Sequence, residues 1–234
     1  MAEGLRILAE AEQAGRLPRW LFYTAEMREH ALVRRLTLRT EAAGGEAIET
    51  NLDILNKLSG KDNPQTVLGV YDEFDTALSA IDRATADIWI VAQALRDPGN
   101  LGTILRTGDA VGAGGLILID DCVDPFSVEA VRASMGALFT QAIAQAGWDE
   151  FLPWLRSGLG ELVALSLRTD IDYREPRYTA PTFLLVGNEA HGLPAEYEDA
   201  CDLRVKLPMR GKADSLNAAV ATAVTAYQIL GQRM

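Results

Sequence analysis

Five continuous or nearly continuous apolar runs after residue 86 constrain the fold more than any other feature. They read IWIVAQA, GLILID, LVALSL, TFLLVG and LRVKLP. Strands that are apolar on both faces are typical of a parallel sheet covered on both sides. Helical patterns are expected between them, at 100–113, 126–139, 149–157, 194–200 and 214–230. This alternation predicts an α/β fold with a doubly wound parallel sheet.

The first 74 residues predict a second, smaller α/β unit. Helical patterns at 3–15, 25–44 and 51–60 alternate with the strand patterns RWLFYT, EAIET and TVLGVYD. Asn51 suits the N-cap of the third helix, and Gly60 suits its end. Residues 75–86 read as a connector that is partly helical. The expected division is therefore a unit at 1–74, a linker at 75–86 and a second unit at 87–234.

The charge of the chain argues against a nucleic-acid partner when it is taken as a sum. The formal net charge is −11, with −3 over residues 1–74 and −8 over the rest, whereas binding to a phosphate backbone depends on Lys and Arg. The distribution of charge matters more than the sum. Two local segments, MREHALVRRLTLR and RVKLPMRGK, are basic; their cations are Arg28, Arg34, Arg35, Arg39, Arg204, Lys206, Arg210 and Lys212.

Several classes of protein are not expected. No apolar run approaches the ~20 residues that span a bilayer, and the first residues show no signal-peptide pattern, so a cytoplasmic location is expected. Cys122, Cys201, His30 and His191 are too far apart in sequence for a zinc site. The two cysteines are expected to be small buried apolar residues.

The loop after the first apolar run carries the first candidate site residues, because ligands of parallel α/β sheets bind at the carboxyl ends of strands. Asn100 suits the cap of the following helix. Arg106 is expected to pass over Gly102 toward Asn100, although an exposed ion pair with Asp109 explains it equally well. The glycine-rich GDAVGAGG ends a helix, so it lacks the context of a dinucleotide-binding motif.

The loops after TFLLVG and LRVKLP carry the remaining candidates. Gly187 ends a strand where a ligand could approach the backbone, Glu189 follows it, and His191 reads as an exposed loop residue. In the last helix, Asp214 or Ser215 suits the N-cap. Asn217 would then lie in the helix interior, where Asn is disfavoured. The packed face of this helix is expected to hold Leu216, Val220, Ala223, Tyr227 and Leu230.

At these loops the sequence resembles the SpoU (TrmH-type) branch of the SPOUT RNA methyltransferases. The segments that carry the resemblance are DPGNLGTILRTGDAVGAGGLIL, VRASMGALF, FLLVGNEAHGL and VKLPMRGKADSLNAAVATAVTAY. Residues 3–71 are similar to the small ribosomal-protein-like RNA-binding domain often attached in front. The resemblance implies a parallel sheet with a deep C-terminal trefoil knot. It also implies a homodimer that transfers a methyl group from S-adenosylmethionine to a ribose 2′-hydroxyl of rRNA or tRNA, without a metal.

The resemblance also implies site residues, by matched position. The catalytic set is Asn100, Arg106, Glu189, Ser215 and Asn217. The cofactor set is Ser166, Gly187, Leu207, Met209, Ser215 and Leu216. RNA contacts are expected from the local basic segments, through Arg28, Arg34, Arg35, Arg39, Arg210 and Lys212. A guanidinium is a poor base, so Arg106 is expected to hold a phosphate and polarise the hydroxyl.

Two competing functions remain open. A non-enzymatic RNA-binding protein with a decayed site would bind no S-adenosylmethionine, and a different transferase would use another small cofactor.

Overall fold

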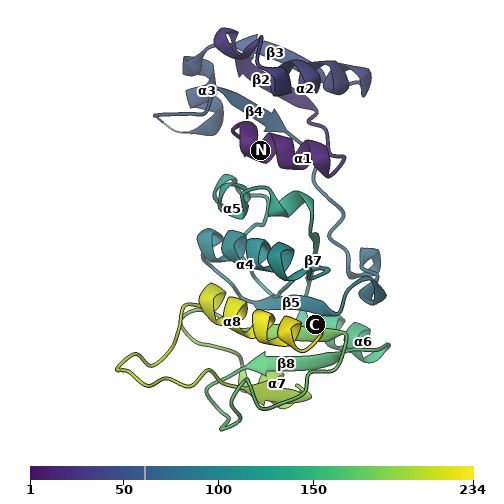
Figure 1. The fold of residues 1–234 in the computed structure, drawn as a ribbon, viewed down its shortest axis with the longest axis vertical. Coiled ribbons are helices and arrows are strands. Elements are labelled where there is room, and N and C mark those ends of the chain that lie inside the picture. Colours follow the sequence, from purple (N-terminus) through teal and green to yellow (C-terminus); the bar gives the residue numbers. More distant parts are fainter. Residues whose placement is uncertain (61) are drawn as a thin grey trace.

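The computed structural model describes residues 1–60 and 62–234. They form two sheets that lie one beyond the other along the long axis of the molecule, each with its own helices (Figure 1). No helix among the described residues is long and apolar enough to cross a bilayer.

The first sheet has four strands in the order β1-β4-β2-β3. Its elements are β1 (Ala2–Glu3), α1 (Leu5–Gln13), β2 (Trp20–Thr24), α2 (Ala31–Ala42), β3 (Glu46–Thr50), α3 (Leu52–Ser59) and β4 (Val67–Val70). The expected strands are confirmed, and so is the Asn51 cap, whose Oδ1 accepts from Ile54 N at 3.0 Å. The single helix expected at 25–44 is wrong. His30 caps α2, and a separate 3-10 turn precedes it.

The second sheet has six parallel strands in the order β10-β8-β9-β5-β6-β7. Its elements are β5 (Ile88–Gln93), α4 (Pro98–Val111), β6 (Gly115–Ile119), α5 (Val128–Ser134), β7 (Ala142–Ala146), α6 (Trp148–Arg156), β8 (Glu161–Leu165), β9 (Thr182–Val186), α7 (Ala195–Asp199), β10 (Leu203–Val205) and α8 (Ala218–Gly231). The parallel α/β architecture is confirmed. The sequence patterns missed the edge strand β7, because AIAQA is short and only its Ile143 and Ala144 are buried.

The helices cover both faces of this sheet, which explains the continuous apolar runs. In β5, Ile90 and Ala92 pack in one cluster with residues of α4, α5 and α8, while Trp89 and Val91 pack on the other face with α6. Each strand therefore buries both sets of alternating side chains.

The two sheets share one hydrophobic cluster. Residues of α1 and the first sheet pack with Val131, Leu138 and Phe139 of the second part. Gly136, at φ 103°, separates α5 from a 3-10 turn, and a Cβ there would lie 2.6 Å from Cβ of Glu10 in α1. The single helix expected at 126–139 is therefore wrong, because the chain turns where α1 approaches it.

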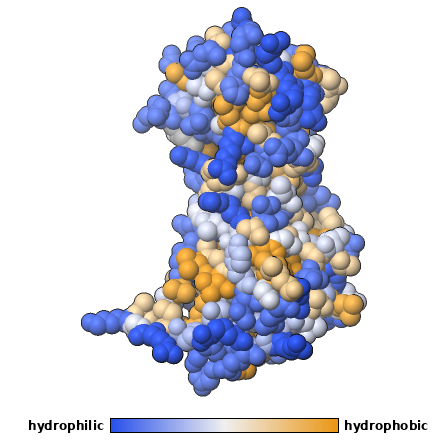
Figure 2. Space-filling model, in the orientation of Figure 1, coloured by the Kyte–Doolittle hydropathy of each residue, from blue (hydrophilic) through white to orange (hydrophobic). Residues whose placement is uncertain are grey.

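Helix α8 differs from expectation in both its start and its packed face. It begins at Ala218, not at 214. The buried residues are Ala218, Ala219, Thr222, Thr225, Ala226 and Ile229. Leu216, Val220 and Tyr227 are exposed by 40%, 47% and 53%, so the expected packed face is wrong. Small side chains let α8 approach α4 and the sheet, and larger apolar groups remain at the surface over α8 (Figure 2).

Candidate active site

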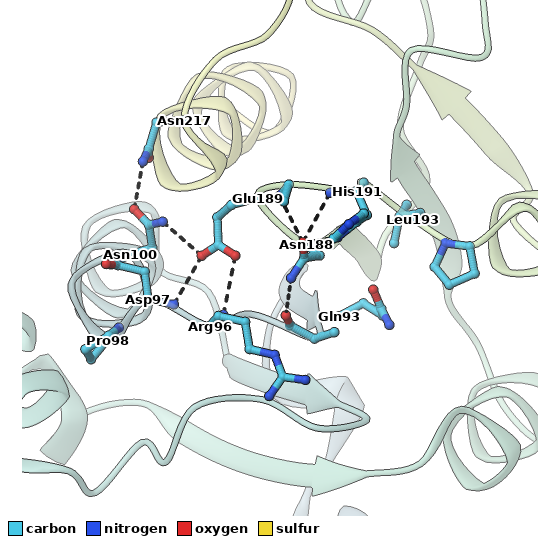
Figure 3. Close-up of a pocket in the computed structure, with 14 residues that line it drawn as sticks. Gln93, Arg96, Asp97, Pro98, Asn100, Asn188, Glu189, His191, Leu193 and Asn217 are labelled. Carbon is cyan, nitrogen blue, oxygen red and sulfur yellow. Dashed lines mark hydrogen bonds between the residues drawn. The ribbon is translucent and has the colours of Figure 1, made fainter.

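The candidate site lies at the carboxyl ends of β5 and β9. The helices that follow these two neighbouring strands lie on opposite faces of the sheet. Ligands of parallel α/β sheets bind at such a point. A cavity of about 1000 Å³, called the larger cavity below, opens there (Figure 3). It is lined by Gln93, Ala94, Arg96, Asp97, Pro98, Asn100, residues 188–194 and Asn217.

The loop at 188–193 is folded tightly by its own residues. Asn188 Nδ2 donates to the carbonyl oxygen of Ala94 at 2.7 Å, and Asn188 Oδ1 accepts from the backbone N–H of Ala190 at 2.9 Å. A Cβ on Gly187 would lie 2.4 Å from the carbonyl carbon of Gly192. Gly187 is therefore required because the loop returns over its own start. The sequence reading missed Asn188, whose role depends on a carbonyl 94 residues away.

Glu189 joins this loop to the loop after β5. Its carboxylate accepts from the backbone N–H groups of Arg96 and Asp97, each at 3.3 Å, and from Asn100 Nδ2 at 3.0 Å. Partial burial opposes the charged form, but these hydrogen bonds outweigh it and hold the pKa of Glu189 below its usual range. Glu189 therefore remains a carboxylate that fixes the position of Asn100.

Asn100 also contacts Asn217, so the three loops are joined in one chain of hydrogen bonds. Asn217 Nδ2 donates to Asn100 Oδ1 at 2.8 Å (Figure 3). Asn217 Oδ1 accepts from the backbone N–H groups of Ala219 and Val220, at 2.9 and 3.3 Å, and caps α8. The expected caps were wrong: Asn217 replaces Asp214 or Ser215, and Asp97 replaces Asn100 on α4.

A second cavity, of about 350 Å³ and called the smaller cavity below, lies on the other side of the 188–193 loop. Its walls come from residues at 165–168, 186–193 and 205–221, and from Glu198 of α7. All six residues of the expected cofactor set line it: Ser166, Gly187, Leu207, Met209, Ser215 and Leu216. Asn188, Glu189, Ala190, His191, Gly192 and Leu193 line both cavities.

A buried carboxylate supports one wall of the smaller cavity. Glu198 is 4% exposed. It accepts from Ser166 Oγ at 2.6 Å and from Arg168 Nη1 at 2.8 Å, and Ser166 Oγ accepts from the Arg168 N–H at 2.9 Å. These bonds hold the 166–168 turn against α7. Ser166 is therefore anchored by its hydroxyl and presents its remaining surface to the cavity.

Arg106 lies outside both cavities, on the exposed side of α4. A Cβ on Gly102 would meet Cβ of Ala133 at 2.4 Å. Gly102 thus makes room for α5, and the expected passage of Arg106 over it is wrong. The alternative pair with Asp109 is also wrong: among the described residues no ion pair joins the two side chains, and Asp109 accepts from Thr140 Oγ1 at 2.7 Å. Within residues 1–60 and 62–234, the Arg106 guanidinium has no hydrogen-bond or ion-pair partner.

The two basic segments differ in how free their cations are. In the first segment, Arg35 and Arg39 both bind the buried Glu12, with distances of 2.7 and 2.9 Å, and Arg28 binds Glu49. Arg34 has only a long exposed contact with Glu29, at 3.5 Å. In the second segment, Arg204 binds Asp199 and Lys206 binds Asp170, at 2.7 and 2.6 Å, whereas Arg210 and Lys212 have no partner among the described residues. They lie in the loop between β10 and α8, which projects from the molecule in Figure 1.

The wall of the larger cavity opposite Asn217 holds Gln93, which the sequence reading did not single out (Figure 3). Its Nε2 donates to Asp120 at 3.0 Å, and Tyr197 donates its hydroxyl to the same carboxylate oxygen at 3.0 Å. Burial and this hydrogen bond raise the pKa of Tyr197 to about 12. Tyr197 also stacks on Trp148 at a centroid distance of 3.9 Å. No local sequence signal joins these four residues.

The two cysteines are not part of the site. Both are half-buried free thiols, so the expectation of fully buried residues holds only in part. Burial raises the pKa of both thiols, to about 12 for Cys201.

Comparison with known proteins assigns a family to this geometry. The SpoU rRNA methylase family matches residues 87–227, and the MRM3-like substrate binding domain matches residues 1–69. The chain is 33% identical to the 23S rRNA (uridine(2479)-2′-O)-methyltransferase of Streptomyces viridochromogenes, over 99% of this chain and 82% of the relative. It is 27% identical to the 23S rRNA (guanosine(2553)-2′-O)-methyltransferase RlmP of Bacillus subtilis, over 88% and 84%.

Solved structures agree over the whole chain. The AdoMet-bound rRNA methyltransferase from Sinorhizobium meliloti superposes with a TM-score of 0.91 at 36% identity, covering 100% of this chain and 87% of that one. The SpoU methyltransferase AviRb in complex with AdoMet gives 0.85 at 30%, covering 99% and 89%. The chain therefore belongs to the SpoU rRNA methylase family.

Proposed function

We propose that the smaller cavity holds S-adenosylmethionine and that the larger cavity receives the ribose to be methylated. The chain is an RNA methyltransferase that uses S-adenosylmethionine and acts on a ribose 2′-hydroxyl of rRNA or tRNA. One observation carries the assignment of the cavities: the 188–193 loop is a wall of both. A methyl donor in one cavity and a hydroxyl in the other therefore meet at this loop.

The residues of the smaller cavity fit the cofactor. Its volume of about 350 Å³ lies within the range of ~300–1000 Å³ usual for small-molecule pockets. Leu165, Val186, Leu207 and Met209 supply apolar surface for a purine, and Ser166 and Glu198 supply polar groups. S-adenosylmethionine supplies an electrophilic methyl group on a sulfonium. The residues of the chain must therefore chiefly position the hydroxyl in line with that methyl and remove its proton.

Asn100, Glu189 and Asn217 are proposed to position the substrate and the cofactor. Their continuous hydrogen bonds, each of 3.0 Å or less, fix the loops of both cavities relative to one another. Ser215, exposed beside the smaller cavity, is proposed to border the cofactor.

Arg106 is proposed to hold an RNA phosphate next to the target ribose, although it lies outside the cavities of its own chain. In a homodimer formed through helices of the second sheet, Arg106 of one copy could reach the cavities of the other. The exposed apolar residues Val220 and Tyr227 of α8 support such an interface. Each site would then be completed by a second copy of the chain.

The trefoil knot and the domain limits are also proposed. In support of the knot, β9 enters the sheet between β8 and β5, and the loops at 186–193 and 205–218 meet around one cavity. We propose domains at 1–74 and 87–234, joined by a linker at 75–86. Each domain has its own sheet, although the two share apolar packing. A cytoplasmic location is proposed from the substrate class, because rRNA is modified where ribosomes are assembled.

The test measures cofactor binding, turnover, and the activity of two inactive variants after they are mixed. Calorimetry with S-adenosylmethionine should give heat, and the protein should methylate rRNA from a strain that lacks it. Arg106→Ala should retain the affinity for S-adenosylmethionine and lose more than tenfold in turnover, a barrier change above ~1.4 kcal/mol. Mixing inactive Arg106→Ala and Asn217→Ala proteins should restore activity if sites are shared between copies. Absent heat and absent methylation would favour the decayed, non-enzymatic site.

A further inference from the structure

His191 is the one imidazole at the boundary between the two cavities. It is exposed and lines both of them. The chain has only two histidines, and the other, His30, caps α2 in the first part of the molecule. An imidazole at this boundary lies where a 2′-hydroxyl and a methyl donor would meet.

The hydrogen bonds of the loop determine which ring nitrogen of His191 carries the proton. Asn188 Nδ2 donates to the carbonyl oxygen of Ala94 at 2.7 Å, which directs Asn188 Oδ1 toward the loop. That oxygen already accepts from the N–H groups of Ala190 and His191, at 2.9 and 3.2 Å. It lies 3.2 Å from His191 Nδ1.

An amide oxygen can only accept, so His191 Nδ1 must be the donor in this contact. In a neutral imidazole with Nδ1 protonated, Nε2 carries a lone pair and can accept a proton. No described residue donates to His191 Nε2. In the neutral ring, the loop therefore favours the tautomer in which Nε2, and not Nδ1, is free to accept a proton.

The other ionisable groups on the cavity walls are already engaged. Glu189 accepts three N–H groups, and the same bonds hold its pKa below its usual range, which makes it a weak base. Asp97 caps α4 through Asn100 N at 2.6 Å. The remaining pairs are Arg96 with Asp121 at 2.7 Å, Arg168 with Glu198 at 2.8 Å, and Lys206 with Asp170 at 2.6 Å.

We propose that His191 Nε2 is the general base that removes the proton of the ribose 2′-hydroxyl. This inference rests on the proposed use of the two cavities. In the step, the O2′–H bond breaks and the proton passes to Nε2, while O2′ forms a bond to the methyl carbon. The sulfur–methyl bond breaks and its electron pair returns to sulfur, so the positive charge moves from the sulfonium to the imidazolium. Neither an oxidant nor a metal is needed.

The first test measures single-turnover methyl transfer with saturating S-adenosylmethionine and a mapped rRNA substrate. His191→Asn should lower the rate at neutral pH by ~10²-fold, the usual range for a lost general base being ~10²–10⁴. His191→Gly should be slow and should regain rate when free imidazole is added. His30→Asn is the matched control, because it removes the other imidazole and should match the wild type.

The pH dependence gives a second readout. The wild-type rate should fall toward acidic pH, because a protonated imidazole cannot accept a proton. The His191→Asn rate should lack this fall. If His191→Asn keeps its rate within threefold, or if its pH profile coincides with that of the wild type, His191 is not the base.

The third readout does not depend on activity. Spectra of protein labelled with ¹⁵N-histidine should show one ring, absent in His191→Asn, as the neutral Nδ1–H tautomer. The opposite tautomer would overturn the inference. His191→Asn should still bind S-adenosylmethionine, which also shows that the variant is folded. If the wild-type protein failed to bind S-adenosylmethionine or to methylate rRNA, the proposed function would be refuted instead.

Discussion

Asn217 performs two tasks with different atoms, so its substitutions should separate stability from turnover. Replacement by Ala removes the Oδ1 cap of α8 and the Nδ2 donor to Asn100. A lost cap costs about 1 kcal/mol, and a lost neutral hydrogen bond costs about 1 kcal/mol. Asn217→Ala should therefore lower the free energy of unfolding by ~2 kcal/mol. Asn217→Asp keeps the cap and should lose ~1 kcal/mol at most, because a carboxylate is favourable at a helix N-terminus.

The rate of methyl transfer should depend on Asn217 Nδ2, which donates to Asn100. Both Asn217→Ala and Asn217→Asp lack the donor to Asn100, so both should lose more than tenfold in single-turnover rate. Urea unfolding gives the stability, and rapid-quench assays with saturating cofactor give the rate. Asn51→Ala is the matched control, because Asn51 only caps α3; it should lose ~1 kcal/mol and keep its cofactor affinity. Wild-type turnover in Asn217→Asp would refute the role of the Asn100 contact.

Three further outcomes are expected. Gly187→Ala should abolish binding of S-adenosylmethionine in calorimetry, because its Cβ would lie 2.4 Å from the backbone of Gly192, whereas Gly211→Ala, with nothing within 4 Å, should bind normally. Glu12→Gln should destabilise the protein by ~2 kcal/mol at neutral pH. Hydrogen bonds from Arg35, and then from Arg39, lower the pKa of Glu12, and they outweigh the opposing effect of burial. That stabilisation is present above the ordinary carboxyl pKa and is lost as the pH falls through the lowered one. The urea midpoints of the two proteins should therefore converge once the pH is below the lowered pKa. Arg210→Ala and Lys212→Ala should each reduce the salt dependence of RNA binding by ~0.7–0.9 in log–log slope; unchanged slopes would exclude contacts with phosphate.

The sequence predicted the sheets well, because the apolar runs of the second sheet and the alternating helices of the first are local signals. It also named residues that the structure gathers around two cavities, through motif positions. The errors concern which side chains of a helix face the interior. Alanine-rich α8 offers many apolar positions, and periodicity alone could not tell that its small residues face inward while Val220 and Tyr227 face outward.

Non-local hydrogen bonds account for most of what the sequence did not reveal. Asn217 looked unexplained inside a helix because the helix start was placed too early. Asn188 gains its role only from the carbonyl of Ala94, and Gln93 only from Asp120. Arg106 shows the limit of spacing arguments: Gly102 beneath it serves the approach of α5.

The shared cluster between the two sheets has a consequence for target choice. Gly136 abuts Glu10, and Phe74 contacts both Phe126 and Phe139, so the joint is built from close backbone approach and aromatic packing. Close packing of this kind leaves little room for one part to move against the other. An RNA element gripped by the first part would select, by distance alone, the nucleotide that reaches the cavities. Changing the length of the joint would then shift the methylated position without altering the chemistry.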